Sequence, residues 1–315
     1  MKKPRESHYV RYARLAYRLT QSVVPRYRHR NSPKTYSQPQ LIACVLLGFY
    51  MDMSYRDLEE WLLATDKVCA VLELTAVPDY STLCRTFHHL RVPLLRALHK
   101  RLLRWLGVTE SAMVADATGF SGTRASQHYI SRTGRKMSDY VKGYYIVGID
   151  QQYILGWHYA RGPGGNDGQY LNCLRRQAHP FGVMQQRRRS WVLLGDKGFD
   201  GIQAHADDLI PPRQGQHPVV RPDRRARLDL TGQARLDGFL GQRWKVETVI
   251  SVMKRKSGDV IRSVQHLRQR REVALKALTY NLHRLPCLLP IYFATEQLEA
   301  GFAVPAGGFE PRAGS

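Results

Sequence analysis

A change of pattern after residue 107 constrains this fold more than any other feature of the sequence. Between residues 37 and 107, apolar side chains recur every three or four positions, which is typical of helices. Beyond residue 107, short apolar runs alternate with turn residues, which is typical of strands. We expect strands at 111–116, 144–150, 153–162 and 191–194, and helices at 167–179, 237–256 and 264–284. This order predicts an α/β domain with a mixed sheet and flanking helices, preceded by an all-α helical region.

The chain is strongly basic, which limits the classes of molecule that it is expected to bind. Its 315 residues include 48 Lys and Arg against 26 Asp and Glu, a formal net charge of +22. Nine of the Lys and Arg lie among the first 30 residues, interleaved with apolar side chains. Such an excess favours a polyanion, and DNA and RNA are the main candidates. The first 30 residues fit a basic helical arm that meets phosphates, and equally an amphipathic helix lying on its own domain.

Other features of the sequence exclude several classes of protein. The longest apolar run, residues 41–51, is too short to span a bilayer, and no signal-peptide pattern opens the chain. Five cysteines without a C-x-x-C pair argue against a disulfide framework and a cysteine zinc site. There is no P-loop and no G-x-S-x-G motif. We therefore expect a cytoplasmic protein without a membrane or small-molecule partner.

The segment VPDYSTLCRTFHHL, residues 77–90, indicates a short capped helix in the helical region. Asp79 or Ser81 can cap it, and Leu83 and Phe87 then lie on one face. Short helices with tight turns and exposed basic residues are typical of helix-turn-helix DNA-binding units. A structural or dimerising bundle shows the same pattern, so both interpretations stay open.

Two aspartates directly follow apolar strands. Asp116 lies in MVADATG and Asp196 in VLLGDKGFDG. The carboxyl ends of strands are where α/β proteins place their sites, and the surrounding small residues allow a ligand close to the backbone. Taken alone, either aspartate is better explained as a turn or helix-cap residue.

A third acidic residue lies on the predicted helix at 237–256. Arg243, Glu247 and Lys254 are spaced by four and seven residues, which puts all three on one helix face. Two aspartates and this glutamate supply the hard oxygen ligands that Mg²⁺ or Mn²⁺ needs. Two such ions can flank a phosphodiester, with Arg243 and Lys254 holding phosphates beside them.

Together these motifs resemble a known family. DATG, GDKGFDG and R-x3-E-x6-K are similar to the DDE transposases of bacterial and archaeal insertion sequences, in the branch with a Y-x2-R-x3-E-x6-K motif. The resemblance covers about residues 37–290. Leu240 stands where the motif has tyrosine, and Phe199 where tyrosine is frequent.

The resemblance implies an RNase H-like, retroviral-integrase-like catalytic domain. Asp116 would lie on its first strand, Asp196 after the fourth, and Glu247 on a late helix. These three would be the catalytic residues and the metal ligands, with two Mg²⁺ or Mn²⁺ ions per active site. The implied domains are a basic arm at 1–36, a helical DNA-binding or dimerisation region at 37–108, the catalytic domain at 109–290 and a flexible tail at 291–315.

The implied activity is DNA transposition and recombination: metal-dependent cleavage at the ends of a mobile element, then strand transfer to target DNA. The partners are double-stranded DNA and a second copy of the chain, in a homodimer or higher assembly at the nucleoid. Two alternatives stay open. One is an RNase H-like endonuclease without strand transfer, and the other is a non-catalytic DNA-binding regulator.

Basic clusters supply candidate phosphate contacts, with solvated basic loops as the alternative interpretation. Besides Arg243 and Lys254, the candidates are Arg187, Arg188, Arg189, Arg224, Arg225, Arg255 and Lys256. We expect residues 211–235, which hold several of them, to be irregular or partly extended. Asp167, after the third strand, is interpreted as structural or as a residue that supports the metal ligands without binding the metal itself.

Overall fold

The computed structural model describes residues 6–31, 33–122, 141–162, 167–183, 191–213 and 220–288. Its centre is a mixed sheet of five strands in the order β3-β2-β1-β4, with β5 pairing on β1. β1 (Ala112–Gly122) and β2 (Val141–Gly148) are antiparallel, as are β2 and β3 (Ile154–Arg161). β4 (Val192–Gly195) and β5 (Val260–Ile261) run parallel to β1. The predicted mixed α/β sheet is confirmed.

β1 is longer than its apolar run predicts. It continues through Asp116 to Gly122, because Phe120 is buried and the distal residues keep their pairing with β2 and β5. The expectation that Asp116 directly follows a strand is therefore wrong, and Asp116 lies inside one. The predicted turn between β2 and β3 is present, and Gln152 adopts a positive φ of 57° there.

The segments before β1 fold into helices. Their bounds are α1 His8–Gln21, α2 Gln38–Tyr50, α3 Tyr55–Leu63, α4 Asp66–Val71, α5 Tyr80–His89 and α6 Val92–Trp105. Local chemistry sets the starts of several: Ser37 and Gln40 form a capping box at α2, and Asp79 caps α5 by accepting from the N–H groups of Ser81 and Thr82. Of the two predicted caps of α5, Asp79 is therefore the one used.

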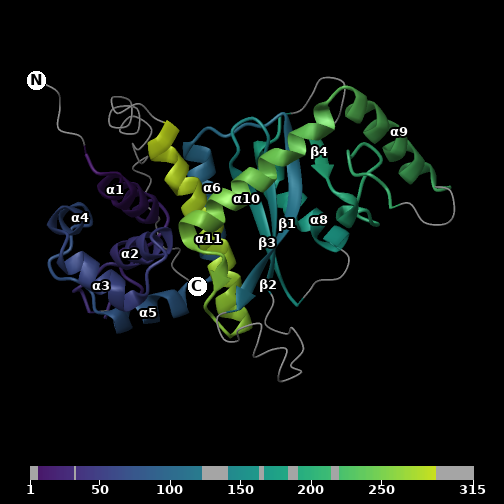
Figure 1. The fold of residues 1–315 in the computed structure, drawn as a ribbon. Coiled ribbons are helices and arrows are strands. Elements are labelled where there is room, and N and C mark those ends of the chain that lie inside the picture. The colour runs from purple at the N-terminus through teal and green to yellow at the C-terminus, as the bar shows by residue number, and fades with distance from the viewer. Residues whose placement is uncertain are drawn as a thin grey trace, which may run out of the picture.

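One helix joins these parts. α11 (His266–Leu288) lies between the N-terminal helices and the sheet (Figure 1), and every residue from 272 to 282 is buried. The main core accordingly combines residues of α1, α2 and α11 with one face of the sheet. The other face packs against α8 (Leu171–Ala178) in a second core. Among the helices described, none is long and apolar enough to cross a membrane.

The region before Glu247 differs from the prediction. Residues 211–235 were expected to be irregular, yet α9 (Pro222–Leu236) is a helix of 15 residues that extends away from the sheet (Figure 1). Pro222 in its first turn and Asp223 near its N-terminus favour the start, and Arg227 anchors it by donating to Asp200 at 2.7 Å. The expected single helix at 237–256 is divided into a 3₁₀ turn, Phe239–Arg243, and α10 (Trp244–Ser257).

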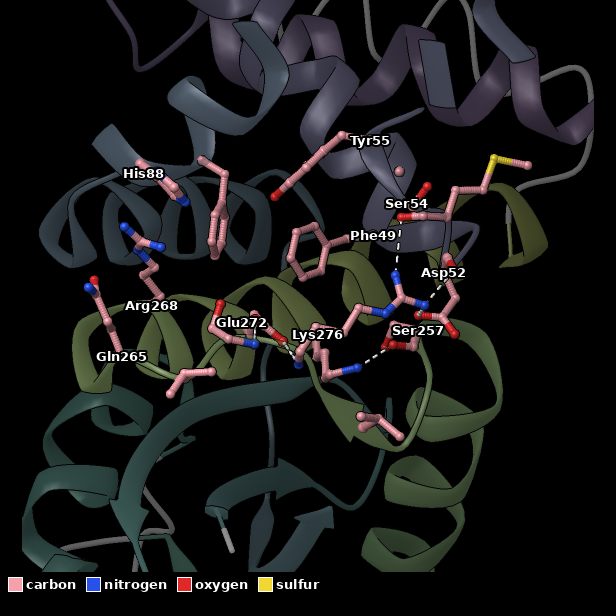
Figure 2. A pocket seen from close by; sticks show the side chains of 17 residues that line it. Phe49, Asp52, Ser54, Tyr55, His88, Ser257, Gln265, Arg268, Glu272 and Lys276 are labelled. Atoms are coloured by element: carbon pink, nitrogen blue, oxygen red, sulfur yellow. Dashed lines mark hydrogen bonds and ion pairs between the residues drawn. The ribbon is translucent and has the colours of Figure 1, made fainter. Parts of the chain in front are cut away.

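A cavity of about 500 Å³ lies where the helical region meets α11 (Figure 2). Its roof carries the aromatic rings of Phe49 and Tyr55 and its floor carries Glu272 and Lys276. The Lys276 ammonium, 2% exposed, donates to the carbonyls of Ser257 and Gly258, the latter at 2.7 Å. The Glu272 carboxylate accepts two backbone N–H groups, from Arg262 at 2.8 Å and from Ser263 at 2.7 Å. The cavity therefore lies at the joint between the helical region and α11, and the charged groups of Lys276 and Glu272 are hydrogen-bonded to the backbone.

Candidate active site

The strand register places Asp116 beside Asp196. In the parallel pairing of β1 with β4, Ala115 is the partner of Gly195, and each directly precedes one of the aspartates. Neighbouring strands lie about 4.8 Å apart. Side chains alternate along a strand, so each aspartate has the orientation of the residue two positions before it. Those residues, Val114 and Leu194, belong to the core that contains α10 and α11, so both aspartates lie on this face.

The Asp116 carboxylate is held in an environment that opposes its charge. Burial raises its pKa to about 6, although the N–H of Ala117 donates to its Oδ1 at 2.8 Å and acts in the opposite direction. The negative charges of Asp196 and Glu247 contribute to this raised pKa, while the positive charge of Arg243 acts against it. Asp196 and Glu247 are therefore both close enough to Asp116 to act on its carboxylate electrostatically.

Asp196 opens the loop after β4. It caps a 3₁₀ turn, Lys197–Phe199, by accepting from the N–H of Gly198 at 2.8 Å. Phe199, the departure from the family's frequent tyrosine, is fully buried in the second core. Within the described part of the chain, no lysine or arginine forms an ion pair with Asp116 or Asp196. Both carboxylates are thus stabilised by backbone N–H groups.

Glu247 approaches from α10 across a cavity of about 610 Å³. The residues lining it include Asp116, Glu247, Lys254, Arg255 and Asp259. The Glu247 side chain is 62% exposed, and its Oε1 lies 3.5 Å from Arg243 Nη2, a weak contact. Arg243 itself lies just before α10, although its helical backbone keeps it on the predicted face.

The aspartates supply hard oxygen ligands, and no described lysine or arginine forms an ion pair with either of them, which suits a divalent metal. The oxygens of Asp116, Asp196 and Glu247 do not all lie within 4.8 Å of one another; of the described residues, His205, Asp207 and Asp208 form a group that does. Asp208 in that group is buried and paired with Arg175 at 2.7 Å, which explains it as structural. The carboxyl oxygens of Asp116, Asp196 and Glu247 are therefore spread more widely than the ligand atoms of the His205 group.

The predicted basic residues of α10 point in different directions. Lys254 lines the cavity, and its Nζ donates to the carbonyl of Gly119 on β1 at 2.6 Å. Arg255 is exposed and also lines the cavity. Lys256 lies over the ring of Tyr50, 5.9 Å from its centroid, and so faces the helical region. Only the first two are therefore beside the acids.

The other basic candidates also differ in whether they are exposed or engaged within the protein. Arg224 is engaged within the protein, since it donates to Asp200 at 2.9 Å and to the carbonyl of Arg213 at 2.7 Å. Arg225, the next residue of α9, is exposed. The predicted patch Arg187, Arg188 and Arg189, and the tail at 291–315, lie outside the described residues. Leu240, where the family motif has tyrosine, packs against the main core.

Sequence reasoning missed two features of the site. Trp244, directly after Arg243, exposes 54% of its surface at the start of α10. Lys142 on β2 forms an ion pair with Asp167 at 2.7 Å, beside the loop that carries Asp196. The position of Trp244 next to Arg243 could have been noticed in the sequence. No sequence pattern indicates that Lys142 pairs with Asp167, 25 positions away.

A family model described as the transposase DDE domain matches residues 108–282, more than half of the chain. The chain belongs to this family of DDE transposases. The matched range runs from just before β1 into α11, and so includes all three candidate acids and the transposase motifs identified in the sequence.

Individual relatives are more distant. An uncharacterised protein of Aquifex aeolicus (strain VF5) is 25% identical over 248 residues, which cover 74% of this chain and 73% of that protein. A cryo-EM structure of the piggyBac transposase synaptic complex with hairpin DNA aligns with 96% of this chain and 85% of its own, at 10% identity and a TM-score of 0.35. The family membership of this DDE transposase therefore rests on the domain match.

Proposed function

We propose that this DDE transposase binds the ends of an insertion sequence and cleaves DNA strands there with divalent metal ions. The observation that carries the proposal is the register of β1 and β4, which sets Asp116 beside Asp196 with Glu247 across one cavity. Carboxylates facing DNA without a cation would repel it, so a cluster of three beside basic residues favours metal-dependent chemistry over simple binding.

Asp116, Asp196 and Glu247 are the proposed ligands of two Mg²⁺ or Mn²⁺ ions. When bound, such ions supply an activated water and stabilise the leaving oxygen of the phosphodiester. Asp116 and Asp196 are held by the sheet and its backbone N–H groups, while Glu247 reaches in from the more exposed helix. Arg243, Arg255 and Lys254 are proposed to hold phosphates, because they lie close to the acids.

Protonation of Asp116 competes with the metal. Because its pKa is raised to about 6, the carboxylate takes up a proton just below neutral pH. We therefore expect cleavage to fall as the pH drops through about 6 at limiting Mg²⁺, and to recover at higher Mg²⁺ concentration.

The proposal extends to the rest of the chain. The catalytic domain is proposed to be RNase H-like. The helical region is proposed to contact element ends, as are the exposed Arg225 of α9 and residues Arg187, Arg188 and Arg189. A free 3′-hydroxyl at the cut end would then attack a target phosphodiester in the same site, an in-line transfer that needs no covalent protein intermediate. Two copies on paired ends complete the proposed assembly.

A strand-cleavage assay on the DNA ends flanking the gene tests this function. Wild type and Asp196→Asn are compared with Mg²⁺, with Mn²⁺ and with EDTA, and Asp52→Asn in the other cavity is the matched control. Metal-dependent cutting that is lost only in Asp196→Asn supports the site, and joined products identify a transposase. Cutting without joining indicates a nuclease. Tight binding to the ends without any cutting indicates a regulator and contradicts the proposal.

A further inference from the structure

A half-buried ion pair lies beside the loop that carries Asp196. Lys142 on β2 and Asp167 are joined in a bidentate contact, with Nζ 2.7 Å from Oδ1 and 2.8 Å from Oδ2. The Tyr144 hydroxyl donates to the same Oδ1 at 3.0 Å. Only 18% of the Lys142 side chain and 14% of the Asp167 side chain are exposed. Three donated hydrogen bonds therefore fix this carboxylate in one orientation.

Gly198 connects this pair to the active site. A Cβ atom at Gly198 would lie 2.8 Å from Asp196 Oδ1 and 3.1 Å from Asp167 Oδ2. Both carboxylates are therefore packed closely against Gly198. The N–H of Gly198 also donates to Asp196 Oδ1. The turn that holds Asp196 is thus packed directly against Asp167.

The two neighbouring carboxylates differ in how their charge is balanced. Asp167 has a lysine of its own. Asp196 has no basic partner among the described residues and lies beside Asp116. An unneutralised Asp167 would add a further negative charge next to a metal site, where it could draw an ion away from Asp116.

We propose that the Lys142–Asp167 pair positions Asp196 and neutralises the adjacent charge, so that Asp167 stays out of the set of metal ligands. The inference rests on the proposed function, since it assumes that Asp116 and Asp196 bind the metal. Lys142 and Asp167 are positioning residues, and neither touches the reacting atoms.

The proposal requires the two single substitutions to change metal affinity in opposite directions. In Lys142→Met the Asp167 carboxylate is left charged and free to join the site, so Mn²⁺ binds more tightly while cleavage falls. In Asp167→Asn the lysine is left unpaired beside Asp196, so Mn²⁺ binds more weakly. At the effective dielectric of a partly buried site, one charge at this range changes affinity roughly tenfold.

Calorimetric titration of the full chain with Mn²⁺, without DNA, tests this. We expect affinity to rise roughly tenfold in Lys142→Met and to fall roughly tenfold in Asp167→Asn. The double variant, with neither charge, should return near the wild-type value, as should Lys142→Arg, which retains the charge. Thermal unfolding of each variant identifies any that fail to fold, and the Lys142→Arg comparison still separates charge from packing.

Two results are distinguishable. If both single variants weaken Mn²⁺ binding alike, the pair serves only the fold and the inference is wrong, while the proposed function stands. If wild type and Asp116→Asn bind Mn²⁺ equally, the metal site is misplaced, and both the proposed function and this inference fail.

Discussion

The cavity beside Asp116 and the cavity above Lys276 both contain buried charge, but the charges find their partners differently. Above the joint between α11 and the helical region, Lys276 and Glu272 are bound to backbone carbonyls and N–H groups, and Arg262 pairs with Asp52 at 3.0 Å. Beside Asp116, the aspartates accept backbone N–H groups and have no basic partner among the described residues. Charge that is satisfied internally stabilises a fold, whereas charge left facing a cavity is available to a ligand.

The largest effect should come from Glu247→Gln, which removes one of the three acidic charges of the candidate active site. We expect cleavage to fall by about 10³-fold or more, because a proposed metal ligand is lost where transition-state charge develops. Stability and DNA binding should change little, since the side chain is mostly exposed. Parallel measurement of cleavage, of DNA binding by fluorescence anisotropy and of unfolding checks this. A loss of DNA binding equal to the loss of cleavage would show that Glu247 is structural.

In the cavity above Lys276, we expect a substitution to lower stability and to leave cleavage unchanged. Lys276→Met leaves two buried carbonyls without their charged donor and should lower the free energy of unfolding by about 3 kcal/mol. Cleavage per folded molecule should stay near that of wild type. Lys254→Met is the matched control, because Lys254 is only half-buried and should cost less stability. Equal stability losses in the two variants would remove the contrast between the cavities.

Asp116→Asn should make the protein more stable at neutral pH. The pKa of Asp116 is raised from 3.8 to about 6, so between these values the native state binds more protons than the unfolded chain. Stability that Asp116 contributes at acid pH is therefore lost as the pH rises through about 6, and asparagine avoids this loss. We expect a gain of roughly 3 kcal/mol at pH 7.5 that shrinks toward pH 4. Urea unfolding across this range measures it, and a destabilised variant at pH 7.5 would contradict the cause given for the shift.

The smallest expected effect is a difference in the salt dependence of DNA binding between variants of two adjacent arginines of α9. Arg225→Ala removes an exposed charge and should reduce the slope of DNA affinity against salt by about one phosphate contact. Arg224→Ala removes a partner of Asp200 and should lower stability, with a smaller change in the slope. Titrations at several salt concentrations compare them. Identical salt slopes for both variants would show that exposure does not identify the DNA contacts.

Much of the catalytic fold could be predicted, because its strands are dense apolar runs bounded by turn residues. The position of Asp196 directly after β4 followed from those runs, whereas that of Asp116 did not, because β1 continues to Gly122. The spacing of Arg243, Glu247 and Lys254 indicated a common helix face. Their mutual arrangement came from the family resemblance, since no local pattern specifies that β4 pairs in parallel with β1.

What the sequence did not reveal depends on contacts made at a distance. The sequence of α9 is basic and begins with proline. Its attachment to the rest of the domain depends on the hydrogen bond from Arg227 to Asp200, 27 residues away. The pairing of Lys142 with Asp167 crosses from β2 to the turn after β3, and Lys254 turned out to donate to a β1 carbonyl. Such partners follow from tertiary packing, which neither spacing nor composition encodes.

Counting protein-bound Mn²⁺ by electron paramagnetic resonance tests the central claim most directly. The measurement compares wild type, Asp116→Asn and Asp52→Asn, which change one aspartate in each cavity. The account predicts that bound Mn²⁺ is lost in Asp116→Asn and kept in Asp52→Asn. Undiminished binding in Asp116→Asn would contradict it.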